Sequence, residues 1–243
     1  MAPILTYHRV GDLPQSSPLA KLAVPAPQFE AQLRWLSRKG FHFVSLDDLR
    51  ASLLGEKTLP RRSVALAFDD GLADNFEEAF PLLKAFGASG TFFIVAGRIG
   101  GTAPDGARCM GAEELRQLDA AGMAIGSHAM THPHLAHLPR EEARRELADS
   151  KAALESILGK PVRWLCYPFG SFNREVAAMA KELGYAGACS VMRDNRQSAR
   201  QMYWLPRVMV MPGVSLLRFA HYLSPLYHFV HTPKNRRRWK EWL

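Results

Sequence analysis

The sequence predicts an α/β fold in which mainly parallel strands close into a distorted barrel. Short apolar runs alternate with amphipathic helical patterns from one end of the chain to the other, and this alternation indicates a parallel sheet covered by helices. No glycine-rich dinucleotide turn follows an early strand, which favours a barrel over an open doubly wound sheet. The length of 243 residues also suits one α/β barrel. Periodicity alone leaves the choice between the two sheets open.

The chain is expected to contain about seven or eight strands. Those that the pattern locates cover residues 3–7, 41–44, 63–68, 91–95, 123–126, 162–167 and 185–189. Helices are expected at residues 27–39, 75–86, 113–121, 139–158 and 174–183, and Ser45 is expected to cap a further one. In the first helix Phe29, Leu33 and Leu36 recur on one face, and Gly40 follows as the residue that ends it.

The composition excludes several classes of protein. A hydrophobic fraction of 47% and a charged fraction of 22% are ordinary for a globular chain and exclude disorder or a fibre. No run of 18 apolar residues is present, so no transmembrane helix is expected. The three cysteines are widely spaced and form neither a disulfide framework nor a CxxC site, which indicates a reducing compartment. The first residues lack the pattern of a signal peptide, so a cytoplasmic location is expected.

The last twelve residues, 232–243, are expected to form a basic tail after a main domain of residues 1–231. The tail contains five Lys or Arg residues and one Glu, which gives +4 of the net charge of +8. Basic side chains beside Trp239 and Trp242 suit peripheral contact with the anionic inner face of a membrane. Nucleic acid is a weaker candidate because only the tail supports it. A solvated or docked segment is the structural alternative.

Polar side chains follow several of the predicted strands. In parallel α/β folds, reactive groups gather at the carboxyl ends of strands. Asp69 and Asp70 follow the strand at 63–68, and His8 follows the first strand. Two adjacent carboxylates beside a buried strand suit a shared cation, because the cation relieves their repulsion. A pair that caps the following helix is the structural alternative.

His128 and His132 follow the strand at 123–126. On a helical turn this i, i+4 spacing places two imidazoles on one side, where they can bind one metal ion. Two His and one carboxylate leave coordination positions open, as in hydrolytic zinc sites. Because His134 and His137 lie in the same stretch, a His-rich surface loop is the alternative.

Together these motifs resemble the polysaccharide deacetylase family, which is carbohydrate esterase family four. The pattern consists of Phe-Asp-Asp-Gly at 68–71, Ser-His-x-x-x-His at 127–132 and Tyr-Pro-x-Gly at 167–170. The opening ILTYHRV and the LPR at 205–207 resemble the bacterial branch of that family. The resemblance covers residues 3–210 and implies a distorted (β/α)7 barrel. It also implies hydrolysis of an N-acetyl group on a hexosamine, with release of acetate.

The resemblance implies a role for each motif. Asp70, His128 and His132 would bind one divalent transition metal ion, commonly Zn²⁺ in this family, and Asp69 would be the general base. Such an ion lowers the pKa of bound water from ~15.7 to about 7. The backbone N–H of Phe169 would hold the developing oxyanion. This N–H belongs to the turn that the resemblance assigns to substrate and oxyanion binding, which contains Tyr167, Pro168, Phe169 and Gly170.

His8 is the candidate general acid for the departing amine, and a structural histidine is its alternative. The sequence departs from the Arg-Pro-Pro-Tyr-Gly of many members, because Cys166 stands at the Arg position and Phe169 at the Tyr position. We predict that Arg207 takes over the contact with Asp69. The usual late Leu-x-His motif has no clear match, which favours His8 as the acid.

The expected substrate is an N-acetylated glycan or a lipid-linked glycan precursor. One alternative is a metal-dependent amidohydrolase of the same fold that acts on a small non-sugar amide. Another is a sugar-binding relic without catalysis, although a relic has no need of a base. Candidate aromatic walls for a sugar groove, which could equally be core residues, are Trp35, Trp164, Phe172 and Trp204.

Overall fold

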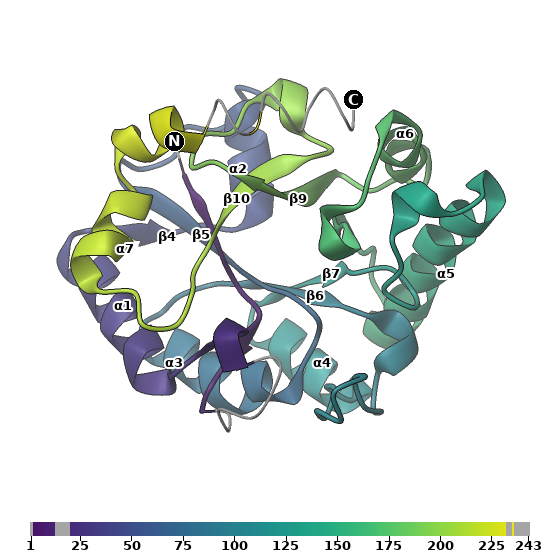
Figure 1. Cartoon of the computed structure of the whole chain (residues 1–243), viewed down its shortest axis with the longest axis horizontal. Coiled ribbons are helices and arrows are strands. Elements are labelled where there is room, and N and C mark those ends of the chain that lie inside the picture. Colours follow the sequence, from purple (N-terminus) through teal and green to yellow (C-terminus); the bar gives the residue numbers. More distant parts are fainter. Residues whose placement is uncertain (1, 13–19, 232–234, 236–243) are drawn as a thin grey trace.

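The computed structural model describes residues 2–12, 20–231 and 235. A closed barrel of parallel strands forms the centre, and helices surround it (Figure 1). Around the barrel the order is β1-β10-β9-β8-β7-β6-β5, and pairing of β1 with β5 closes the ring. The strands are β1 (Ile4–Tyr7), β5 (Ser63–Phe68), β6 (Thr91–Ile94), β7 (Ala124–Ser127), β8 (Trp164–Cys166), β9 (Gly187–Arg193) and β10 (Leu205–Met209). The predicted distorted (β/α)7 barrel is confirmed.

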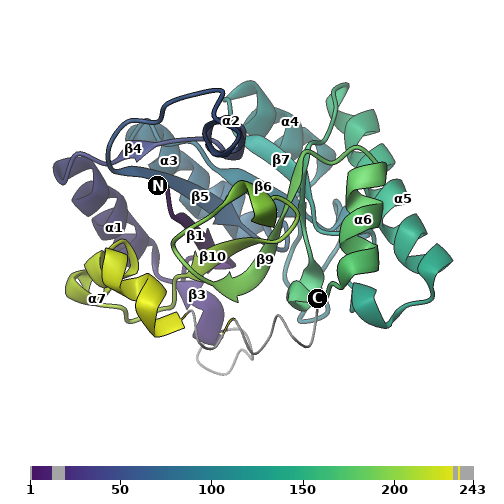
Figure 2. The ribbon, with the colours of Figure 1, turned by 90° about the horizontal axis from the view of Figure 1, so that it is seen from above.

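Three short strands lie outside the ring. β4 (His42–Phe43) pairs with β5, and β2 (Arg9–Val10) pairs with β3 (Ala23–Val24) in a small second sheet. The helices are α1 (Ala26–Arg38), α2 (Leu46–Leu53), α3 (Phe80–Ala85), α4 (Ala112–Ala120), α5 (Arg140–Leu158), α6 (Arg174–Glu182) and α7 (Leu216–Tyr222). Seen from above, α1 and α7 lie at one end of the molecule and α5 and α6 at the other (Figure 2). None of the helices in the described ranges could span a bilayer.

Alternate residues of each strand face opposite sides of the barrel wall, as the two-residue period of a strand requires. Ala65, Ala67, Phe93, Trp164 and Cys166 share one buried cluster, which fills the inside of the ring. Their neighbours in sequence belong to the larger cluster beneath the helices. Continuing the inward set by two residues leads from Ala67 to Asp69, so the barrel wall itself aims this carboxylate inward.

Several predicted boundaries were wrong. The strand expected at 185–189 begins at Gly187, because the Tyr185 N–H donates to Ala180 O and completes the end of α6. The helix expected at 75–86 begins with a π-helical turn, Asn75–Ala79, before α3. β10 and α7 were not predicted. The pattern of β10 is hard to see because Pro206 and Arg207 interrupt its apolar run. The Ser45 cap is confirmed, with a capping box to Asp48.

Candidate active site

A pocket of about 760 Å³ opens at the carboxyl ends of the barrel strands. Every residue predicted to act as a base, an acid or a metal ligand lines it; these are His8, Asp69, Asp70, His128 and His132. They come from the ends of β1, β5 and β7. Closure of the barrel makes β1 and β5 neighbours, and only β6 separates β5 from β7. The fold therefore brings together groups that are up to 124 positions apart in the sequence.

Asp69 forms a buried ion pair with Arg207 at the inner end of the pocket. The Arg207 Nη1 and Nη2 atoms donate to the two carboxylate oxygens at 2.8 Å each, and Nε donates to Ser190 O at 3.0 Å. Both side chains are only 3% exposed. Burial alone would raise the pKa of Asp69, but the charge and hydrogen bonds of Arg207 bring it below its usual value. The contact predicted between Arg207 and Asp69 is thus present, and the carboxylate is ionised at neutral pH.

Cys166, which stands at the Arg position of the third motif, lies against this ion pair. Its Sγ is 3.0 Å from Arg207 Nη2 and 3.7 Å from Asp69 Oδ2. The residue is fully buried, as expected for a small apolar side chain in the barrel. Asp69, His128 and Cys166 also offer ligand atoms within 4.8 Å of one another. The guanidinium of Arg207 touches this group, however, and its positive charge disfavours a cation there.

A second group of three side chains has the chemistry of a metal site. Asp70 Oδ1 lies 3.5 Å from His128 Nε2 and 3.3 Å from His132 Nε2, and the three ligand atoms lie within 4.8 Å of one another. His128 Nδ1 hydrogen-bonds to Cys166 O at 2.7 Å. That bond fixes the ring and leaves Nε2 to face Asp70, which is the usual support for a metal-binding imidazole.

The protonation of Asp70 and His132 suits a metal ion, whereas His128 would have to give up a proton to bind one. Burial lowers the pKa of His128, but its contacts with Cys166 and Asp70 hold that pKa well above the usual value. Burial would raise the pKa of Asp70, but hydrogen bonds from His128 and His132 hold it well below its usual value. Burial lowers the pKa of His132. An ionised carboxylate and a neutral imidazole are the forms that bind a divalent transition ion. One carboxylate oxygen with two imidazole nitrogens therefore fits such an ion and leaves positions open for substrate.

The predicted helical turn between His128 and His132 is wrong. The segment is an irregular loop, in which Ala129 and His132 have φ values of 63° and 69°. Among the described non-glycine residues only five have a positive φ, and the site holds four of them: Asp70, Ala129, His132 and Phe169. Such strain gathers where a fold has to aim functional groups. Left-handed backbone, not helical periodicity, brings the two imidazoles together.

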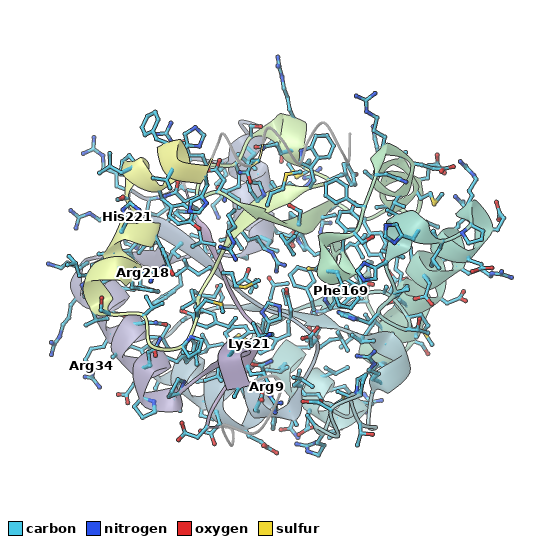
Figure 3. The ribbon with its side chains drawn as sticks, in the orientation of Figure 1. Arg9, Lys21, Arg34, Phe169, Arg218 and His221 are labelled. Atoms are coloured by element: carbon cyan, nitrogen blue, oxygen red, sulfur yellow. The ribbon has the colours of Figure 1, made fainter. Side chains whose placement is uncertain are left out.

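His8 lies on the other side of the base. Its Nε2 is 4.0 Å from Asp69 Oδ2, and its side chain is 17% exposed. It therefore faces both the pocket and the carboxylate, which is where a group that hands a proton to a leaving amine has to lie. His221, which with Ala220 is a poor match to the late Leu-x-His motif, lies on α7 at the surface (Figure 3) and does not line the pocket.

The turn after β8 exposes a backbone donor. Phe169 has φ 56° and ψ 6°, and in the described part of the chain its N–H donates to no backbone carbonyl. Gly170 follows with φ 64°, and a Cβ at this position would come within 2.2 Å of Val191 Cγ2. The turn thus needs a glycine both for its conformation and for its space. Tyr167 also lines the pocket, but its hydroxyl donates to Tyr203 O and its ring is buried.

The expected aromatic groove walls lie elsewhere. None of Trp35, Trp164, Phe172 and Trp204 lines the pocket, and Trp164 and Phe172 are buried in the core. The exposed aromatic residue at the pocket is Phe169, which is 55% exposed, whereas Tyr167 is buried. Its ring stacks on His134, with centroids 4.2 Å apart. Figure 3 shows Phe169 on the side of the barrel nearest α5 and α6. Three charged residues of the pocket were also not predicted: Arg98, Asp105 and Arg193.

A parallel barrel that presents a paired carboxylate and an Asp-His-His group in one pocket defines a hydrolase of the α/β-barrel class. The family model for polysaccharide deacetylase matches residues 56–188, which is more than half of the chain. This chain therefore belongs to the polysaccharide deacetylase family.

Individual relatives agree with this assignment. A putative polysaccharide deacetylase of Bacillus subtilis, YxkH, is 29% identical over 92% of this chain and 76% of its own length. The poly-beta-1,6-N-acetyl-D-glucosamine N-deacetylase of Staphylococcus aureus is 25% identical over 85% of this chain and 77% of its own length. The deacetylase PplD of Streptococcus pyogenes, solved with acetate, has the same fold, with a TM-score of 0.84 over 92% of this chain and 98% of that one, at 24% identity.

Proposed function

We propose that this polysaccharide deacetylase removes the acetyl group from N-acetylglucosamine units of a glycan by hydrolysis and depends on a divalent metal ion. The observation that carries the proposal is the meeting of Asp69 with Asp70, His128 and His132 in one pocket. The Staphylococcus aureus relative is named for the same reaction on poly-β-1,6-N-acetyl-D-glucosamine. The products are a free amine and acetate, so one water is consumed for each acetyl group.

Asp70, His128 and His132 would hold the ion, for which we propose Zn²⁺. When bound, such an ion polarises the amide carbonyl and lowers the pKa of water. Asp69 is placed to take the proton from the attacking water, and Arg207 keeps its carboxylate ionised and oriented. The Phe169 N–H would donate to the oxygen on which negative charge develops. His8 would then supply the proton that the amine needs as the C–N bond breaks.

The shape of the site favours a sugar over a small non-sugar amide. A volume of about 760 Å³ lies within the range that accommodates a drug-sized ligand or larger. Phe169 is exposed at the pocket, and an exposed ring gives the apolar face of a pyranose a surface to pack on. The active site of an enzyme for a small amide would not need a pocket of this volume.

Acetate release and metal content, measured together, test the proposal. The wild type should release acetate from N-acetylglucosamine oligomers and contain one equivalent of metal. Asp69→Asn should keep the metal and lose most of the rate, whereas His128→Ala should lose both. A wild-type protein that releases no acetate would contradict the activity. Full activity after exhaustive metal removal would contradict the proposed metal dependence.

A further inference from the structure

Two arginines at the pocket take no part in the ion pairs that the described residues form around it. Three carboxylates line the pocket, and each has a partner: Asp69 pairs with Arg207, Asp70 contacts the two imidazoles, and Asp105 lies 3.1 Å from Arg9. Arg98 and Arg193 also line the pocket. Within residues 2–12, 20–231 and 235, neither of these two side chains forms an ion pair.

The two arginines flank the reacting groups. Arg98 ends the short 3₁₀ helix Ala96–Arg98 after β6, and Arg193 is the last residue of β9. Between β6 and β9 in the barrel lie β7 and β8, whose ends supply the two imidazoles and Phe169. A sugar placed with its acetamido group at the metal site would therefore have one guanidinium on each side.

Arg98 is held in place without losing its charge. Its Nη2 donates to Thr131 O at 3.2 Å, one residue before His132. A backbone carbonyl uses one of its five donors and neutralises none of the charge. Arg193 is exposed and ends an otherwise buried strand. A guanidinium with spare donors suits a phosphate or carboxylate group, which it can bind through two hydrogen bonds.

We propose that Arg98 and Arg193 form a subsite for an anionic group, and that the substrate is an N-acetylhexosamine that carries a phosphate or carboxylate. This inference rests on the proposed function and narrows its substrate class. A neutral glycan would leave both guanidinium groups without a counter-charge at the walls of the pocket. An anionic substituent would give these two guanidinium groups an ion-pair partner and fix the direction in which the sugar enters.

Matched pairs of sugars test the inference. N-acetylglucosamine 1-phosphate is compared with methyl N-acetylglucosaminide, and N-acetylmuramic acid with N-acetylglucosamine, by acetate release. For each pair we measure the ratio of kcat/KM for the anionic sugar to that for the neutral one. The wild type should prefer at least one anionic sugar, and Arg98→Gln or Arg193→Gln should lower that ratio about tenfold, the loss of one charge-assisted contact. The pair that responds distinguishes phosphate from carboxylate.

Arg163→Gln is the control, because Arg163 is half exposed, pairs with Asp47 and lies outside the pocket. Its ratio should equal that of the wild type. The preference should also fall as salt is raised. Acetate release from both members of each pair, with a ratio that neither pocket substitution changes, would overturn the inference and leave the proposed function standing. No release from these four sugars by an enzyme that does deacetylate N-acetylglucosamine oligomers would overturn the inference alone, and no release from the sugars or the oligomers would overturn both.

Discussion

The ion pair between Arg207 and Asp69 yields the sharpest prediction, because its loss should affect stability and rate by separate routes. In Arg207→Ala the two bonds of 2.8 Å and the bond to Ser190 O are lost. The Asp69 carboxylate would then be buried without a counter-charge. Removing one partner of a buried pair costs about 3–5 kcal/mol of the free energy of unfolding. For a chain of this length, that lowers Tm by roughly 10 °C.

The effect on the rate follows from the same geometry. Without Arg207, the main opposition to burial is lost and only His128 and His8 still lower the pKa of Asp69. That pKa should therefore rise, and less of the base should be ionised at neutral pH. The carboxylate also loses the two parallel hydrogen bonds that orient it. General base catalysis contributes about 10²–10⁴-fold, and we expect kcat to fall within that range. Bound metal should stay at the wild-type level, because Asp70, His128 and His132 do not contact Arg207 within the described residues.

Two further variants keep the test decisive. Arg207→Lys retains a positive charge but not the two parallel bonds, so it should fold better than Arg207→Ala and still lose rate. Arg163→Ala breaks an ion pair whose side chains are each 50% exposed, and this should change stability by less than about 1 kcal/mol. Thermal denaturation, metal analysis and acetate release are measured on all three. Wild-type kcat in folded, metal-loaded Arg207→Ala would refute the reasoning.

Three other predictions concern separate parts of the chain. Gly170→Ala should lower acetate release at least about tenfold and leave metal content unchanged, because a Cβ 2.2 Å from Val191 Cγ2 displaces the turn that carries the Phe169 N–H; an unchanged rate would contradict it. Burial raises the pKa of Asp74 to about 6 despite its contact with Arg9. Because the pKa of Asp74 is higher in the folded chain, the protonated carboxyl stabilises the fold fully below the unfolded pKa near 3.8. This contribution to the free energy of unfolding is lost as the pH rises through 6. Asp74→Asn should then gain up to about 3 kcal/mol relative to the wild type between pH 4 and 7, measured by denaturant unfolding, and a constant difference would contradict this. The predicted basic tail, residues 232–243, lies almost entirely outside the described residues. If the tail binds membranes, the whole chain should pellet with anionic vesicles and a chain ending at residue 231 should not, whereas equal pelleting would end the idea.

Much of the fold was predictable because local signals agree with it. β5 was located to the residue, since six consecutive apolar or small residues end in two carboxylates. Gly159, with φ 67°, ends α5 where the sequence indicated. The strand β10 escaped prediction because its Arg207 contradicts the apolar pattern. Arg207 can be buried in the barrel because it pairs with Asp69, which lies 138 positions away in the sequence. The periodicity of a local segment does not reveal a partner at that distance.

The candidate site was likewise predictable only in part. Residue type and strand-end position marked Asp69, Asp70, His128 and His132 as candidates, and the family resemblance gave each of them a role. How the two histidines meet was not predictable, since it depends on left-handed backbone at Ala129 and His132, which helical spacing does not describe. The arginines of the pocket were not found for a different reason. Arg98 and Arg193 belong to no motif, and only their place at the pocket, outside the ion pairs that the described residues form there, distinguishes them from surface arginines.

The departure at Cys166 bears on whether this family member is a relic without catalysis. Many members place an arginine at that position to hold the base, and its loss taken alone suggests decay. Here the guanidinium comes instead from Arg207 on β10, two strands away from β8 in the ring. Inward-facing positions of different strands converge on one axis, so either strand can deliver the same group to Asp69. Cys166 fills the vacated space and contacts the incoming Arg207 at 3.0 Å. The contact with Asp69 that an arginine at position 166 would supply is therefore present in this chain, and the cysteine there is no argument against the proposed role of Asp69 as the base.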